Sequence, residues 1–318
     1  MVKADTAEKI LNAAESLRYQ VNPIARSLKT ARSRTIGLVI PDLTNPLFPP
    51  IVRGIEDVLG PAGYNAWIVN TDNDPERERA QIESLLLRQV EGLIVATARL
   101  DHPLLTQLYK QGMKLVLINR EVEGLKIPSV VVDDSTGIAL AVEHLVSLGH
   151  ERIAHIAGPQ NDSTGVVRAT AFRQAMRDHG LKTNRSLVMH CAYWNEAEGA
   201  RALRVLLDRG TSFTAVVAGN DLIALGCYDV LAERGMSCPE DLSVIGFNDM
   251  PFLDKLRPPL TTVGLPHYDV GAEAARMLLA RIEDPGARPR PVLLPLSLVI
   301  RRSTGPPASN KPGSSLTT

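Results

Sequence analysis

The sequence predicts an α/β fold with two doubly wound parallel sheets. Short apolar runs alternate with helical patterns along most of the chain, which is typical of repeated βα units. The alternation begins again after residue 133, so the units form two similar halves. Glycines follow the helical patterns just before the next apolar run, where a helix C-cap favours glycine. A length of 318 residues also fits two units of about 150 residues each.

The first half predicts five buried strands with helices between them. Their apolar runs lie at 36–40, 64–70, 92–97, 114–119 and 129–132. Amphipathic stretches lie at 47–60, 74–89 and 103–111. These stretches are long enough to be the crossover helices that parallel strands require.

The second half repeats the pattern. Its strands are predicted at 152–157, 186–191, 214–218 and 242–247, and its helices near 135–148, 165–179, 196–209 and 220–234. The remaining runs at 260–265 and 291–300 and a helix near 268–283 are too little for a third domain, so we expect them to complete the two sheets. This predicts one subdomain from 35–133 with 263–286 and another from 134–262 with 287–303. The tail, 304–318, is rich in Gly, Pro and Ser, and we expect it to be disordered.

The first 35 residues differ from the rest of the chain. They hold seven basic and three acidic residues in a chain of zero net charge. Asp5 and Glu8 form a possible capping box for a helix over 6–18, and Asn22 with Pro23 begins a shorter second helix. The excess of positive charge points to an anionic partner. A solvated basic helix and linker is the alternative.

Composition and motifs exclude several classes of protein. Hydrophobic residues are 44% and charged residues 22% of the chain, as in globular proteins. No apolar run approaches a membrane span and no signal peptide is present, so we expect a cytoplasmic protein without a membrane partner. Cys191, Cys227 and Cys238 have no metal spacing, which predicts reduced structural thiols and no bound metal.

The common signatures of enzymes and cofactor sites are absent. The sequence contains no GxxxxGK[ST], no GxGxxG after a strand, no HExxH and no GxSxG, so we expect neither a cofactor nor catalysis. His150 and His155 could be acid and base groups, but His155 falls within an apolar strand and His150 at its entry. We therefore interpret both as structural residues.

Polar side chains follow the predicted strands, where ligands of open α/β sheets bind. These positions are 42–48, Asn119 and Arg120, Asp133 and Asp134, Asn220 and Asp221, and Asn248 and Asp249. Phe48 and Trp194 are rare aromatic residues in the same kind of loop and could stack on a sugar or a base. The alternative is that the Asn and Asp residues cap helices and that Trp194 packs a helix start. Their joint placement favours a pocket for a polar molecule.

The chain resembles the LacI/GalR family of bacterial transcriptional regulators over nearly its whole length. The resemblance rests on AEKILNAAESLRYQVNPIARSLKT, RTIGLVIPDLTNPLF, HLVSLGHERIAHIAG, FTAVVAGNDLIALG, LSVIGFNDMPF and RPPLTTV. It implies a homodimeric regulator, expected to be a repressor, with a periplasmic-binding-protein-like core of type I. An effector, expected to be a carbohydrate, would bind between the subdomains and alter affinity for an operator in double-stranded DNA.

The resemblance also assigns roles to residues. The effector-binding positions that it implies are Leu47, Phe48, Asn119, Asp133, Arg168, Trp194, Asn220 and Asn248. Those implied for DNA binding are Asn22, Ala25, Arg26, Ser27, Leu28 and Lys29. Leu28 matches the leucine that family members insert into the minor groove, which kinks the duplex. Asn248 stands where many members have aspartate. We expect Arg168→Ala to abolish the response to effector while the fold stays intact.

The resemblance departs from the family at the start of the chain. Residues 1–34 match only the third helix of the helix-turn-helix and the hinge helix, so the helix that reads the major groove is missing. Either Met1 is a wrongly assigned start or the protein is a natural truncation, and we expect the former. A sugar-binding protein or sensor that does not bind DNA is the alternative function, and an enzyme on the same scaffold is a third.

Overall fold

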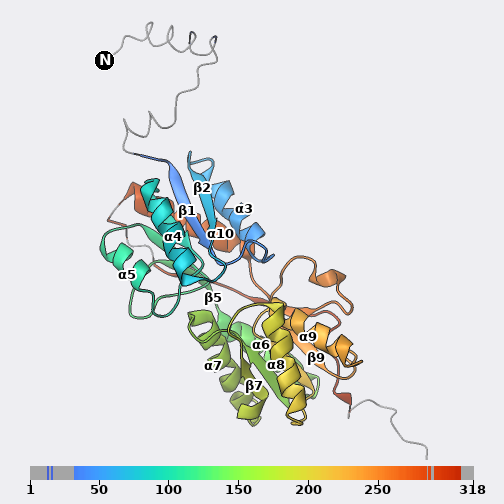
Figure 1. The fold of residues 1–318 in the computed structure, drawn as a ribbon. Helices are drawn as coiled ribbons and strands as arrows, with labels where there is room; N and C mark the ends of the chain where they lie inside the picture. The colour runs from blue at the N-terminus through green and yellow to red at the C-terminus, as the bar shows by residue number, and fades with distance from the viewer. Residues whose placement is uncertain (1–12, 14–15, 17–31, 285, 288–289, 309–318) are drawn as a thin grey trace, which may run out of the picture.

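A computed structural model of the chain describes residues 13, 16, 32–284, 286–287 and 290–308. These residues form two α/β lobes, each built on one sheet (Figure 1). The strand order is β11-β5-β4-β3-β1-β2 in the first lobe and β12-β10-β9-β8-β6-β7 in the second. Helices cover both faces of each sheet, so the predicted fold class of two doubly wound α/β subdomains is confirmed.

The first lobe holds six parallel strands in the part of the chain that the structure describes. They are β1 (Thr35–Ile40), β2 (Asn65–Asn70), β3 (Gly92–Val95), β4 (Leu115–Ile118), β5 (Ser129–Val132) and β11 (Val292–Leu294). One face packs against α3 (Phe48–Leu59) and α10 (His267–Glu283), and the other against α4 (Pro75–Leu87) and α5 (Pro103–Lys110). The central strands are apolar on both faces, as a sheet covered by two helix layers requires.

The second lobe repeats this architecture. Its strands are β6 (Ile153–Ala157), β7 (Val188–His190), β8 (Ala215–Ala218), β9 (Ser243–Asn248), β10 (Thr261–Gly264) and β12 (Ser297–Val299). One face packs against α6 (Asp134–Ser147) and α7 (Ser163–Asp178), the other against α8 (Glu196–Asp208) and α9 (Asp221–Glu233). Short 3-10 turns lie at η1 (Arg185–Leu187) and η2 (Leu253–Lys255). Strand β12 pairs antiparallel with β10, so this sheet is mixed.

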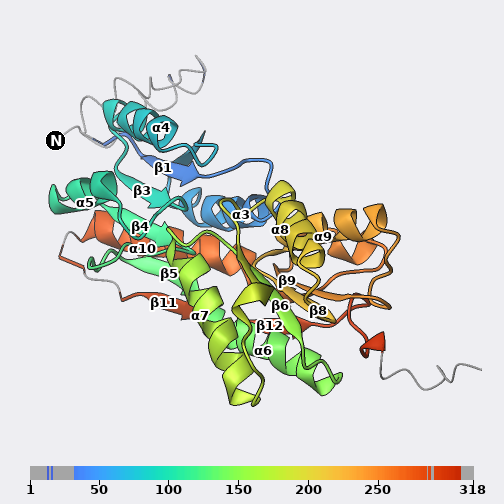
Figure 2. The same cartoon turned by 60° about the horizontal axis from the view of Figure 1, so that its bottom comes forward.

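Corresponding helix pairs in the two lobes approach closely through glycines. A Cβ atom on Gly54 of α3 would lie 2.1 Å from the Tyr268 carbonyl oxygen of α10, with which α3 runs side by side (Figure 2). A Cβ on Gly199 of α8 would lie 2.2 Å from the Ile223 carbonyl oxygen of α9. Because these distances are far below van der Waals contact, neither position accepts a side chain without the helices moving apart.

The chain crosses between the lobes three times, and two crossings fall later than the boundaries predicted at 263 and 287. Strand β10 stays in the second sheet through Gly264, so the second crossing precedes α10. The apolar run 291–300 forms β11 in the first sheet and β12 in the second. Pro295 separates them: it has no N–H for a strand ladder, and the third crossing lies there.

The start of the predicted tail is held in place by hydrogen bonds. Thr304 bonds to His144, and the Gly305 carbonyl accepts from Ser243 Oγ at 3.1 Å and lies 2.8 Å from His150 Nε2. The predicted disorder therefore does not include these two residues, whose backbone and hydroxyl groups find buried partners that composition alone does not reveal. Residues 309–318 lie outside the described residues.

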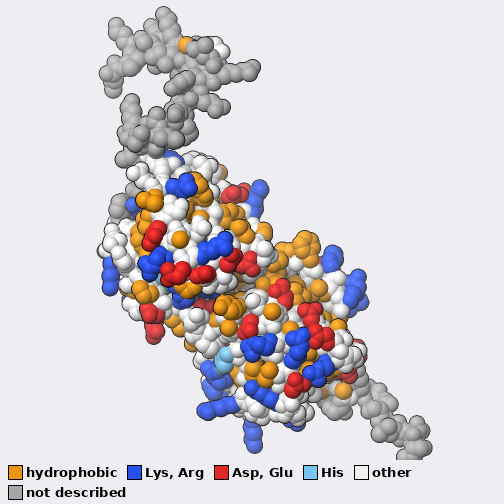
Figure 3. Space-filling model, viewed as in Figure 1, with side chains coloured by type: hydrophobic (Ala, Val, Ile, Leu, Met, Phe, Trp, Pro, Cys, Tyr) orange, Lys and Arg blue, Asp and Glu red, His pale blue; other side chains and the backbone are white. Residues whose placement is uncertain are grey.

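The predicted DNA-binding residues lie outside the described residues. They are Asn22, Ala25, Arg26, Ser27, Leu28 and Lys29. On the face drawn in Figure 3, acidic and basic side chains of the described residues are intermixed over both lobes.

No helix in the described part of the chain combines the length and apolar character that crossing a membrane demands.

Candidate ligand-binding cavity

A cavity lies between the two lobes, at the carboxyl ends of their strands. It encloses about 760 Å³ of space, including the part open to solvent. Residues from both lobes line it: Pro41, Asp42, Asn45, Leu47, Phe48, Asn73, Ala96, Asn119, Arg120, Thr164, Arg168, Tyr193, Trp194, Asn195, Asn220, Asn248 and Leu265. Seven of the eight effector-binding positions implied by the sequence are among them, and Asp133 is not.

Asp133 has a structural role beside the cavity. It is the N-cap of α6, and its carboxylate accepts hydrogen bonds from the Thr136 backbone N–H at 3.0 Å and from the Thr136 hydroxyl at 2.7 Å. Its own N–H donates to the Leu294 carbonyl oxygen at 3.2 Å, which joins the first and third crossings. The capping alternative therefore describes this residue, because both carboxylate oxygens already have local partners.

Arg168, on α7, is the most constrained polar side chain in the cavity. It is only 4% exposed. Its Nε donates to Asp134 at 2.7 Å and its Nη1 to the Gly219 carbonyl oxygen at 2.7 Å, and its Nη2 lies 3.5 Å from Asn248 Oδ1. The guanidinium carbon lies 3.5 Å from the centre of the Phe247 ring. These contacts fix the orientation of the guanidinium, so its remaining N–H groups are preorganised.

The partner carboxylate of Arg168 is buried, with the Asp134 side chain 9% exposed. Burial raises the pKa of Asp134, and the adjacent positive charge of Arg168 opposes that rise. Asp134 does not line the cavity, so it compensates the charge of Arg168 from outside the cavity lining. Of this ion pair, only Arg168, the hydrogen-bond donor, lines the cavity.

Trp194 forms an aromatic surface in the loop before α8. Its Nε1 donates to Asp162 at 2.8 Å, and the same carboxylate caps α7 through the Gly165 N–H at 2.7 Å. The indole packs directly on Gly158, where a Cβ would lie 2.0 Å from a ring atom. Since its polar atom is already bonded within the protein, Trp194 offers a ligand only apolar surface and its π face.

Three of the six asparagines that line the cavity have an oxygen engaged in helix caps or turns. Asn220 Oδ1 accepts from the Ile223 N–H at 2.8 Å, Asn195 Oδ1 from the Glu198 N–H at 2.9 Å, and Asn45 Oδ1 from the Leu47 N–H at 3.0 Å. These bonds to backbone donors fix which end of each amide is oxygen. The Nδ2 groups have no hydrogen-bond partner among the described residues.

Three further asparagines hold positive backbone φ angles at strand ends. These angles are 58° at Asn73, 59° at Asn119 and 121° at Asn248. Asparagine tolerates this region better than most residues, which accounts for its use where each chain turns out of a strand toward the cavity. Asn119 Oδ1 is buried and has no partner among the described residues.

The loop after β9 is tied to α9 by a buried carboxylate. Asp221 accepts a hydrogen bond from the Met250 N–H at 2.9 Å and one from the Thr262 hydroxyl at 2.5 Å. Burial raises the pKa of Asp221 to about 6, although both hydrogen bonds favour its charged form. This contact holds the segment that follows Asn248.

Polar contacts join the lobes beside the cavity. The Thr164 hydroxyl donates to the Asn119 carbonyl oxygen at 2.5 Å, and the Glu121 N–H donates to the Ser163 hydroxyl at 2.9 Å. Arg120 Nη2 lies 3.5 Å from an oxygen of Asp162. The loop after β4 is therefore fastened to the start of α7, which sets the spacing of the two cavity walls at this edge.

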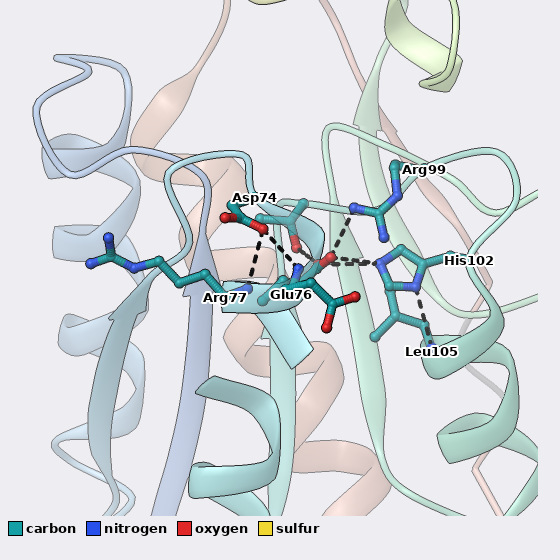
Figure 4. Close-up of polar contacts among 8 residues, drawn as sticks. Asp74, Glu76, Arg77, Arg99, His102 and Leu105 are labelled. Atoms are coloured by element: carbon teal, nitrogen blue, oxygen red, sulfur yellow. Dashed lines mark hydrogen bonds and ion pairs between the residues drawn. The ribbon is translucent and has the colours of Figure 1, made fainter. Parts of the chain in front are cut away.

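A smaller hollow of about 440 Å³ adjoins the cavity and contains a buried polar cluster. Its centre is Glu78 of α4, which is 2% exposed and accepts hydrogen bonds from the Thr97 hydroxyl and from Arg99 Nη1 at 2.9 Å (Figure 4). His102 Nε2 lies 3.1 Å from the same carboxylate, while its Nδ1 accepts from the Leu105 N–H. Burial works against ionisation, but the hydrogen bonds and the charge of Arg99 hold the pKa of Glu78 below its usual value.

Sequence reasoning missed several residues of this region. Asn73, Thr164, Tyr193 and Asn195 line the cavity although none directly follows a predicted strand. The helix signals offered a way to find two of them, because Asn195 is an N-cap and Thr164 lies in a first turn. His150 and His155 lie outside the cavity, and His155 stacks on Phe172 within the core.

Comparisons with known proteins agree on one kind of relative. A family profile described as a periplasmic binding protein-like domain matches residues 142–304. The ribose operon repressor of Halalkalibacterium halodurans is 33% identical over 303 residues, which cover 95% of this chain and 89% of the relative. The transcriptional repressor CytR of Escherichia coli K12 is 31% identical with the same coverage of both chains.

Solved structures match as well. The complex of the transcriptional regulator CelR with cellobiose has a TM-score of 0.79 and 29% identity, covering 95% of this chain and 92% of that one. A LacI family regulator from Enterococcus faecium with bound ribose has a TM-score of 0.75 and 33% identity, covering 86% and 99%.

Proposed function

Because the chain belongs to the LacI/GalR family of transcriptional regulators, we propose that it is a repressor whose effector, a sugar, binds in the cavity between the lobes. It is a ligand-sensing, DNA-binding regulator and not an enzyme. The finer proposals are the sugar, its position and the direction of the response.

The observation that carries the proposal is the composition of the cavity walls. Phe48 and Trp194 supply apolar surfaces suited to the face of a sugar ring. Arg168, Asn220 and Asn248 supply polar atoms, and each of these residues is at most 5% exposed, so its side chain is held in place. The structures of relatives with bound ribose and cellobiose support the same class of ligand. We propose Leu47 and Asn119 as further contacts.

The position of the cavity explains how a ligand could act at a distance. A molecule that touches walls from both lobes stabilises one relative arrangement of them over another. It shifts the equilibrium by its difference in affinity for the two arrangements. We propose that this shift reaches the hinge segment, where Asn22, Ala25, Arg26, Ser27, Leu28 and Lys29 would contact operator DNA in a cytoplasmic homodimer.

Ligand binding is tested first on the full chain by calorimetry and thermal denaturation with pentoses, hexoses, disaccharides and sugar acids. Tyr193 lines the cavity and is 52% exposed, so Tyr193→Ala should leave the fold intact. We expect it to weaken binding of the active sugar about tenfold, since burying an aromatic side chain against a ligand is worth about 1.5–3 kcal/mol. Tyr268→Ala, at a 44% exposed tyrosine of α10 outside the cavity, is the matched control. Equal effects of the two changes would contradict the proposed site.

DNA binding is tested by selecting duplexes from a random library with the full chain and measuring affinity by fluorescence anisotropy. We expect Leu28→Ala to weaken binding and the active sugar to change the affinity of the unmodified chain. Failure to enrich any duplex, with sugar binding retained, would favour the alternative of a sensor that does not bind DNA. Sedimentation equilibrium tests the dimer, and a monomer at micromolar concentration would refute it.

A further inference from the structure

The wall of the cavity that the second lobe provides consists mainly of hydrogen-bond donors. The oxygens of Asn195 and Asn220 are engaged as helix caps, and Asn248 Oδ1 faces Arg168. Their Nδ2 groups remain without partners among the described residues. Arg168 uses three of its five N–H groups on Asp134, Gly219 and Asn248, which leaves two further donors. Trp194 adds no acceptor, because its indole nitrogen is a donor and already bonded.

The wall that the first lobe provides holds donors such as Arg120 but also supplies acceptors that are free within the described part of the chain. Asn119 Oδ1 is buried without a partner among the described residues. Asp42 uses Oδ1 for the Thr44 N–H and hydroxyl, at 2.8 and 2.7 Å, and its Oδ2 has no partner among the described residues. A sugar hydroxyl must donate its proton as well as accept one. Asn119 Oδ1 and Asp42 Oδ2 are therefore available as acceptors for ligand hydroxyls on this wall.

The carboxylates that pair with Arg168 and Arg120 lie outside the cavity lining. Asp134 pairs with Arg168 and Asp162 with Arg120, but neither carboxylate lines the cavity itself. A ligand anion would therefore meet the guanidinium and amide donors before it meets these carboxylates. A carboxylate accepts several N–H groups and adds one negative charge, whereas a phosphate dianion adds two charges to a site whose arginines are already paired.

We infer that the effector is a sugar acid, whose carboxylate faces Arg168, Asn220 and Asn248 and whose hydroxyls face Asp42 and Asn119. This inference rests on the proposed function, because it specifies the chemical class of the sugar at the same site. Asn248 is the residue that makes the distinction, since an aspartate at this position would place a carboxylate against that of the ligand.

The test compares neutral sugars with their acids, of which the uronates differ from the parent sugar only at C6. The probes are D-glucose with D-glucuronate and D-gluconate, D-galactose with D-galacturonate, and glucose 6-phosphate as the dianion, measured by calorimetry on the full chain. We expect at least one acid to bind tenfold or more tightly than its neutral sugar and than the phosphate. A neutral sugar that binds as tightly as its acid overturns the inference and leaves the proposed function standing. If no probe binds, the inference fails, and the pentoses and disaccharides of the first test decide the proposed function separately.

A substitution at Asn248 tests the inference on the protein. Asn248→Asp should weaken binding of the acid at least tenfold more than binding of the neutral sugar, because only the acid meets the new negative charge. Asn184→Asp makes the same change at an exposed cap of η1 outside the cavity and should alter neither affinity. Equal loss of acid and neutral sugar in Asn248→Asp would overturn the inference, since it would show a structural effect instead of a charge effect.

Discussion

Arg168→Ala is predicted to destabilise the protein strongly. The Arg168–Asp134 pair is 2.7 Å long, and its side chains are 5% and 9% exposed. Removing one partner of a buried ion pair leaves an uncompensated charge and costs about 3–5 kcal/mol. At roughly 2–4 °C for each kcal/mol, the melting temperature should fall by about 10 °C. This corrects the expectation from sequence that Arg168→Ala leaves the fold intact, which took the side chain for a ligand contact alone.

The double variant Arg168→Met with Asp134→Leu separates the ion pair from the packing around it. Replacing both charges by apolar side chains removes the unpaired carboxylate, so the double variant should be more stable than Arg168→Ala. Urea denaturation of Arg168→Met, of Asp134→Leu and of the double variant gives the coupling energy between the two positions. A loss of less than about 1 kcal/mol in Arg168→Ala, or a double variant no more stable than it, would refute the reasoning.

The other predictions concern packing, pH and spectroscopy. Gly199→Ala should destabilise the protein by about 1–3 kcal/mol in urea denaturation, because its Cβ would meet the backbone of α9. Gly60→Ala is the control: its Cβ would meet nothing nearer than 3.2 Å, so it should change stability by less than about 0.5 kcal/mol. The pKa of Asp221 is raised to about 6, so the folded state binds this proton more tightly than the unfolded state. The stability of the protein should therefore fall as pH rises from about 4 to 6. Thermal denaturation across this range should show a weaker fall in Asp221→Asn. Trp67 and Trp194 are the two tryptophans of the chain, so Trp194 is the only one in Trp67→Phe. A ligand in the cavity should change the fluorescence of Trp194 in this variant. Binding seen by calorimetry without a change in fluorescence would contradict the placement of the ligand beside Trp194.

The order of strands and helices followed from the sequence because local signals agree with the fold. Buried parallel strands are continuous apolar runs, and the helices between them carry N-caps such as Asp74 and Asn220. The assignment of the last segments did not follow. Residues 291–300 are one apolar run, and only pairing with β5 and β10 divides it between the sheets. Such pairing is a long-range property that periodicity cannot report.

The cavity could be located in part from the rule that ligands lie at strand ends, but the use of each polar atom could not. Asp133 and Asn220 both follow strands and both cap helices. Only Asn220 lines the cavity, and its Nδ2 has no partner among the described residues, whereas both oxygens of Asp133 are bonded to Thr136. Sequence gives the residue type and position, whereas the partners that consume each donor and acceptor come from residues far along the chain.

The hydrogen bonds of Arg168 allow one substitution to change what the regulator detects without changing its fold. Arg168 is held by Asp134 and by a backbone carbonyl, so its orientation does not depend on residue 248. The bond to Asn248 is the longest of its three, at 3.5 Å. An amide or a carboxylate at 248 would therefore meet nearly the same guanidinium, but with opposite consequences for a ligand anion. Discrimination between neutral and acidic sugars can thus reside at the end of β9, while stability resides in the ion pair behind it.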